Sequence, residues 1–144
     1  MREPKITSVN DQGDALLGGA RKIILRSKET AGDIYLVEGI MPEGSVVPVH
    51  IHQHEDEIFH VLEGEVQLVL GEEVRVGKAG DIIYLPRGIK HGIQTHGQQT
   101  ARVLNYVIPG KNFEDFFEEM NLLGPNASKS QKAELATKYG IRFL

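Results

Sequence analysis

Apolar and polar residues alternate through most of the chain before Pro109, which is the period of a β-strand. The apolar runs are short and rich in Val, Ile and Leu, and turn residues separate them, as in Gly71-Glu72-Glu73. No alternation of strand and helix patterns is visible, so a parallel α/β fold is disfavoured. Closely spaced short strands are typical of an all-β sandwich or barrel. We predict strands at residues 21–27, 34–41, 46–52, 57–62, 66–70, 74–76, 81–85, 92–95 and 101–108.

The period changes to that of a helix after Gly110. An apolar face with i, i+3, i+4, i+7 spacing predicts an amphipathic helix, and Asn112 precedes this face as the expected N-cap. The face has two interpretations: it covers an exposed sheet or a partner subunit, as such helices usually do, or it forms a lid over a cavity. Its residues are Phe113, Phe116, Phe117 and Met120.

A second helix is expected near the C-terminus. Ser128 or Ser130 would cap its start, and it would end at Tyr139 because Gly140 follows. The chain is thus expected to consist of a β-barrel domain at residues 1–110 and a helical extension at residues 111–144 that packs on the barrel.

Composition excludes several classes of protein and narrows the available chemistry. Of the 144 residues, 40% are hydrophobic and 25% are charged, which is a globular balance. The formal net charge is −4 and no basic cluster occurs, so nucleic acid is a poor candidate partner. The chain has no cysteine, and a metal site would therefore use His and carboxylate ligands. Neither a signal peptide nor a membrane span is visible, so we expect a cytoplasmic protein without a membrane partner.

Three histidines and one glutamate form a candidate metal site. His50 and His52 lie on one face of the predicted strand 46–52, where two imidazoles can meet one ion. A turn in the acidic segment 55–57 would let the next strand bring Glu57 beside them. His91 follows the tight turn Pro86-Arg87-Gly88, and such a turn can aim a side chain across a sheet. A His-x-His pair alone is more often a surface or core pair than a metal site, so the combination carries this prediction.

Two motifs in this region resemble those of the cupin superfamily. The motifs are separated by residues 65–79, a short spacing like that of microbial single-domain cupins. Cupins often have Asn at the last motif position, where this chain has Thr95, and this departure weakens the inference about substrate more than that about metal. The first motif is Gly44, five residues, His50-x-His52, four residues, Glu57, six residues and Gly64, and the second is Gly80, five residues, Pro86-x-Gly88, two residues and His91.

The resemblance implies a double-stranded β-helix, which is a small antiparallel jelly-roll barrel, with a C-terminal helical extension. It also implies one divalent transition metal ion per chain, held inside the barrel by His50, His52, Glu57 and His91. Fe, Ni, Zn, Mn and Cu all suit this ligand set, which does not choose among them.

The stretches 50–64, 109–117 and 138–141 resemble bacterial cupins that are described as quercetin-dioxygenase-like. The resemblance therefore implies a metal-dependent dioxygenase acting on an enolic or phenolic small molecule, with Glu57 as the catalytic residue that removes a substrate proton. Two alternatives stay open. One is a redox-neutral metal-dependent isomerase or lyase, and the other is a small-molecule-binding module without turnover.

The remaining histidines are expected outside the metal site. His54 is placed at the rim or behind the ligands, His60 on the opposite strand face from Glu57, and His96 in an exposed loop. Bulky residues that could line a pocket, and could equally form ordinary barrel core, are Tyr35, Met41, Phe59, Tyr84, Ile93 and Tyr106.

A homodimer is also predicted. The strand at 57–62 is apolar on both faces, with Phe59 and Val61 on one and Ile58 and Leu62 on the other. Together with an exposed Phe-rich helix face, this is more apolar surface than a soluble monomer usually leaves in water.

Overall fold

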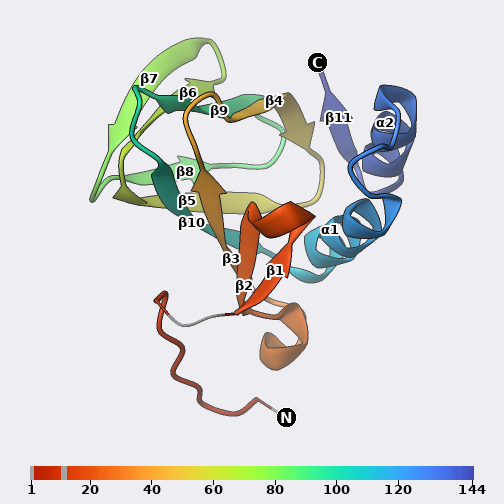
Figure 1. Ribbon diagram of the computed structural model, residues 1–144. Helices are drawn as coiled ribbons and strands as arrows, with labels where there is room; N and C mark the ends of the chain where they lie inside the picture. The colour runs from red at the N-terminus through yellow and green to blue at the C-terminus, as the bar shows by residue number, and fades with distance from the viewer. Residues whose placement is uncertain (1, 11–12) are drawn as a thin grey trace.

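A computed structural model describes residues 2–10 and 13–144 as two antiparallel β-sheets that face each other, with two helices at one side of the sandwich (Figure 1). The first sheet has the order β1 (Asp14–Leu16), β2 (Arg21–Leu25), β3 (Tyr35–Met41), β10 (Ala101–Ile108), β5 (Asp56–Glu63) and β8 (Ile82–Leu85). The second has the order β11 (Ile141–Phe143), β4 (Val46–His52), β9 (His91–His96), β6 (Glu65–Leu70) and β7 (Glu73–Lys78). The predicted all-β architecture is confirmed.

The predicted strands are all present, and those at 46–52 and 101–108 have the predicted bounds. Strands β1 and β11 were not predicted. Each has three residues, too few for alternation to show, and β11 exists because Ile141 and Phe143 pair with His52 and His50 of β4. The segment after residue 110 therefore contributes a strand to the second sheet. Single-turn 3₁₀ helices occupy Leu17–Gly19 and Ser27–Thr30.

The strands bury their alternate residues between the sheets. In β3 and β10 the inner positions include Tyr35, Val37 and Val107, all fully buried. At the end of the barrel remote from the helices, the inner residues form an apolar cluster, which we call the apolar half. Its members are Met41, Phe59, Val61, Val66, Leu68, Leu85, Ile93, Ala101 and Val103.

Helices α1 (Lys111–Leu123) and α2 (Lys129–Lys138) lie beside edge strands β1 and β11 (Figure 1). The rings of Phe113, Phe116 and Phe117 are buried in the chain's own core, packed with Tyr35 and Ile141 among others. The helix therefore covers the interior of its own barrel. The expectation that its Phe face lies exposed for a partner subunit is wrong.

The start of α1 also corrects a prediction. The N-cap is Gly110, not Asn112. Gly110 packs so closely on β3 that a Cβ atom there would lie 2.3 Å from the backbone nitrogen of Tyr35. The Asn112 side chain instead donates to Glu55 Oε1 at 2.8 Å and to the Tyr139 carbonyl at 2.8 Å. The second helix is capped by Ser128, one of the two serines predicted.

Within the described ranges, no helix is long and apolar enough to cross a membrane.

Candidate metal centre

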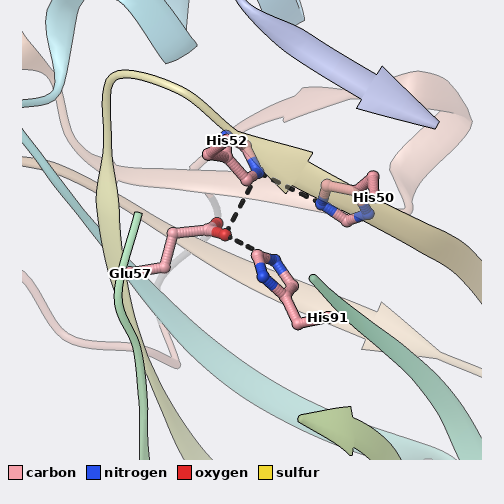
Figure 2. A group of neighbouring side chains, drawn as sticks. All are labelled: His50, His52, Glu57 and His91. Atoms are coloured by element: carbon pink, nitrogen blue, oxygen red, sulfur yellow. Dashed lines mark hydrogen bonds and ion pairs between the residues drawn. The ribbon is translucent and has the colours of Figure 1, made fainter. Parts of the chain in front are cut away.

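Four buried side chains converge inside the barrel, and they are the four predicted ligands (Figure 2). His50 and His52 come from β4, Glu57 from β5 and His91 from β9. The sheet register places His50 directly opposite His91, and the two-residue period places His52 on the same inner face. All four are buried, with exposures of 1–7%.

The ligand atoms are close enough to share one ion. His50 Nε2 lies 3.1 Å from His52 Nε2, and Glu57 Oε2 lies 3.2 Å from His52 Nε2 and 2.9 Å from His91 Nε2. All four donor atoms lie within 4.8 Å of one another. Two ligands at right angles and ~2.1 Å from one ion would be about 3.0 Å apart. The observed separations therefore fit coordination of a common metal.

His50 is held in the state that a metal ligand needs. Its Nδ1 lies 2.7 Å from the Pro48 carbonyl, which can only accept, so Nδ1 carries the proton and Nε2 keeps its lone pair. Burial, together with the neighbouring His91 and His52, lowers the pKa of His50 to about 4. The ring is therefore neutral at neutral pH, with its lone pair directed at the other three groups.

Glu57 supplies the negative charge. Burial by itself would raise its pKa, but the adjacent His52 and His91 outweigh burial and lower the pKa to about 2. Burial opposes the charged form of His52, yet Glu57 and Glu55 raise its pKa. Glu57 Oε2 and His91 Nε2 approach each other without hydrogen-bond geometry and remain unsatisfied. Buried lone pairs left in this way are costly, and a divalent cation would satisfy them together, so the residues fit a metal.

Two further polar residues lie next to the ligands. Glu55 is 1% exposed, and its Oε1 lies 3.9 Å from His52 Nδ1, on the side away from Glu57. Asn105 Nδ2 donates to Glu57 Oε1 at 3.1 Å, which leaves Oε2 for the cluster. Such partners fix the direction of ligands and tune their basicity.

The cluster forms part of the wall of a cavity of about 230 Å³. Phe113 of α1 packs on His52 with ring centroids 4.9 Å apart, and Phe143 of β11 packs on His50 at 5.5 Å. Other apolar lining side chains include Phe59, Ile93, Phe116 and Phe117. The Phe-rich helix thus both packs on the barrel and closes one wall of this cavity.

Several predictions about neighbouring residues are resolved by the structure. His54 lies beyond the end of β4, is exposed and is not part of the cluster. His60 lies on the outer face of β5, as predicted, and His96 is exposed at the end of β9. Phe59 and Ile93 line the cavity, whereas Tyr84 is 61% exposed on the outer face.

Three site residues were missed by the sequence analysis: Glu55, Asn105 and Arg21, which also lines the cavity. Glu55 belongs to the acidic segment 55–57, and its position three residues after His52 was a usable signal of a role at the site. Asn105 and Arg21 are polar residues in largely apolar strands. The only sign that they face inward is that each lies two residues from a buried residue of the same strand, Val103 and Ile23 respectively.

Comparison with known proteins identifies the family. Residues 31–107 match the family model described as a cupin domain. The chain is 29% identical over 112 residues to the quercetin 2,3-dioxygenase of Bacillus subtilis (strain 168), an alignment that covers 76% of this chain and 32% of that protein. Two further curated relatives are spanned over 64% and 62% of their lengths.

Solved structures share the fold. A protein with a double-stranded β-helix domain from Klebsiella pneumoniae subsp. pneumoniae MGH 78578 is 25% identical, with a TM-score of 0.62 over 76% of this chain and 93% of that one. The polyketide cyclase RemF from Streptomyces resistomycificus is 27% identical, with a TM-score of 0.56 over 62% of this chain and 63% of that one. With the domain match covering more than half of its length, this chain belongs to the cupin family.

Proposed function

We propose that this cupin is a metal-dependent dioxygenase that acts on an enolic or phenolic small molecule. The observation that carries the proposal is the convergence of three imidazoles and one ionised carboxylate on the wall of a largely apolar cavity. The similarity to a quercetin 2,3-dioxygenase supports the reaction class, although this chain spans only 32% of that protein.

A divalent transition metal held by His50, His52, Glu57 and His91 would supply Lewis acidity toward an enolic or phenolic oxygen and, if redox-active, the reactivity toward O₂. The chain's own contribution is placement and exclusion of water. The aromatic side chains of the cavity wall can contact a planar ligand and keep water from the site. The hydrogen bond from Asn105 holds Glu57 in position, and the carboxylate of Glu55 lies 3.9 Å from His52 Nδ1.

Glu57 is our candidate for the group that accepts a substrate proton. With a pKa of about 2, its carboxylate is ionised at neutral pH and able to accept one. A base of such low pKa is weak, so we expect the role to be limited to acidic O–H groups, as enols and phenols with electron-withdrawing substituents have.

Oxygen uptake tests the proposal. Metal-depleted protein would be loaded separately with Fe, Ni, Zn, Mn or Cu and supplied with flavonols, simpler enols and phenols. We expect O₂ consumption, measured with an electrode, that requires both a metal and one of these substrates. Absence of O₂ uptake with every metal and substrate would contradict dioxygenase activity.

A redox-neutral reaction is the second candidate, favoured by the similarity to the polyketide cyclase RemF. The same site would use the metal only as a Lewis acid to stabilise an enolate or enediolate. Product formation that continues without O₂ would support this alternative, and ligand binding without any product would support a binding module.

We also propose a homodimer formed through the outer face of the first sheet. Ile82 and Tyr84 of β8 are 62% and 61% exposed, and the register places them opposite His60 and Ile58 of β5 on that face. Ile82→Asp would put a charge in the interface, so we expect this variant to be monomeric by light scattering. The matched control is Val74→Asp, because Val74 is 64% exposed on the other sheet and should leave the dimer intact. A monomeric wild-type protein would contradict the proposal.

A further inference from the structure

Arg21 extends its side chain into the barrel, toward the same cavity as the metal centre. It begins β2 and pairs with Gly39 of β3. A Cβ atom at Gly39 would lie 3.4 Å from Arg21 Nη1, so the guanidinium lies over the space that this glycine leaves open. Arg21 therefore lines the cavity from the first sheet, together with the histidines from the second.

The guanidinium contacts a carbonyl group and an aromatic ring. Its Nη1 donates to the Ala20 carbonyl at 3.0 Å, and its carbon lies 6.0 Å from the centre of the Phe117 ring. No ion pair involves Arg21 in the part of the chain that the structure describes. Arg26, just beyond the other end of β2, differs because it pairs with Asp14 and lies within 4 Å of Glu114 and Glu118.

A cation in this position changes the charge balance of the cavity. Burial lowers the pKa of Arg21 and Glu57 raises it, yet a guanidinium remains charged at neutral pH. A divalent metal would be balanced by two carboxylates, Glu57 in the cluster and Glu55 behind His52, so the guanidinium of Arg21 adds a positive charge that neither of them compensates. Buried charge without compensation is costly, so the cavity favours an anionic ligand.

Asn105 provides a complementary group. Its Nδ2 donates to the Glu57 carboxylate, which fixes the orientation of the amide and leaves Oδ1 as an acceptor. This oxygen has no hydrogen-bond partner, although the residue is only 9% exposed, and Asn105 also lines the cavity. The cavity thus combines a cationic donor and an unsatisfied acceptor between apolar walls.

We infer that Arg21 binds a carboxylate of the ligand, separate from the enolic or phenolic O–H group, so that the substrate enters the cavity as an anion. That the bound anion is the substrate of a reaction rests on the proposed function. That Arg21 binds an anion rests on the cavity alone. The cavity volume of about 230 Å³ lies below the ~300–1,000 Å³ typical of drug-sized ligands, so the substrate is also small.

Benzoate and its neutral analogue benzamide are suitable probes, because they differ in charge and hardly in shape. Binding of each would be measured by calorimetry to zinc-loaded and to metal-free protein. The variants are Arg21→Met, which keeps the length of the stem without the charge, and Arg21→Lys, which keeps a positive charge. Arg75→Met is the matched control, because Arg75 is exposed on β7 and outside the cavity.

We expect benzoate to bind more tightly than benzamide in both metal states. Loss of a charge-assisted hydrogen bond should weaken benzoate binding to Arg21→Met ~10–100-fold, with little change for benzamide. Arg21→Lys should retain part of the preference, and Arg75→Met all of it. In the wild-type protein, benzoate should also shift the NMR signal of the Arg21 side-chain Nε–H, which tests the contact even if a variant does not fold.

Benzoate affinity of Arg21→Met within two-fold of wild type in both metal states would overturn the inference, as would absence of benzoate binding to wild type. Metal uptake is measured separately and should not change in Arg21→Met. If the wild-type protein takes up no metal, the proposed function is rejected. The benzoate measurements on metal-free protein then decide the role of Arg21 on their own.

Discussion

The barrel interior has the apolar half at one end and, at the other, the half around His50, His52, Glu57 and His91, which we call the metal half. Strands β5 and β9 contribute to both halves, which serve opposite purposes. Along the inner face of β5, the carboxylate of Glu57 is followed two and four residues later by Phe59 and Val61 of the apolar half. Along β9, His91 is followed in the same way by Ile93. Only two to four residues along a strand therefore separate the metal ligands from the side chains of the apolar half.

The two halves also differ in how their groups are satisfied. Leu68 and Val61 are 1% and 0% exposed and need only close packing, which stabilises the fold by about 1.5–3 kcal/mol for each buried side chain. In the metal half, Glu57 Oε2, His91 Nε2 and Asn105 Oδ1 are buried without hydrogen-bond partners. The apolar half stabilises the fold without unsatisfied polar groups, whereas the metal half bears an energetic cost that a bound metal and ligand would offset.

Glu57→Gln should produce the largest change: it should keep the fold and part of the metal but abolish turnover. Glutamine preserves size and one neutral oxygen ligand, but it lacks the negative charge and cannot accept a substrate proton. We expect a ~10²–10⁴-fold loss of turnover at saturating metal, with the fold intact. Turnover of the metal-saturated variant within a few-fold of wild type would show that Glu57 is a ligand and not a base.

Leu68→Ala should produce the opposite result. Removing this buried side chain leaves a cavity in the apolar half, and we expect the free energy of unfolding to fall by about 2–5 kcal/mol in urea denaturation. Metal content per folded chain should not change. Val74→Ala, at an exposed β-strand position, is the control and should cost less than about 0.5 kcal/mol. Loss of metal from folded Leu68→Ala would show that the halves are coupled.

Glu55→Gln tests the layer behind the ligands and should have the smallest effect. The variant loses the charge beside His52 while it keeps an oxygen for Asn112. Loss of such second-layer partners typically lowers metal affinity ~10–100-fold, and competition with a chromophoric chelator would measure this. Glu43→Gln, an exposed glutamate in a turn, is the control. Unchanged affinity would mean that Glu55 does not orient His52.

The positions of the histidines and of Glu57 on the strands show which features of the site could be predicted from the sequence. The common face of His50 and His52, and the opposite faces of Glu57 and His60, follow directly from the two-residue period of a strand. Strand and turn geometry made these residues candidates, and the resemblance to the two cupin motifs joined His50, His52, Glu57 and His91 into one predicted ligand set.

Contacts between distant segments were not predictable. The space over Gly39 that admits Arg21, and the bond from Asn112 to Glu55, exist only once the sheets and helices pack. The N-cap of α1 is Gly110 and not Asn112, whose side-chain Nδ2 instead donates across the fold to Glu55 and to the Tyr139 carbonyl. Local propensity therefore located the helix but not its first residue.

The central claim is that His50, His52, Glu57 and His91 hold one metal ion, and the metal content of His91→Ala tests it most directly. Wild type, His91→Ala and His96→Ala would be reconstituted identically and measured by plasma mass spectrometry, with circular dichroism to confirm the fold. His96 is exposed at the other end of the same strand and serves as the matched histidine control. We predict about one ion per chain in wild type and His96→Ala and little in His91→Ala, because a lost ligand weakens the site. Equal metal content in folded His91→Ala and wild type would contradict the account.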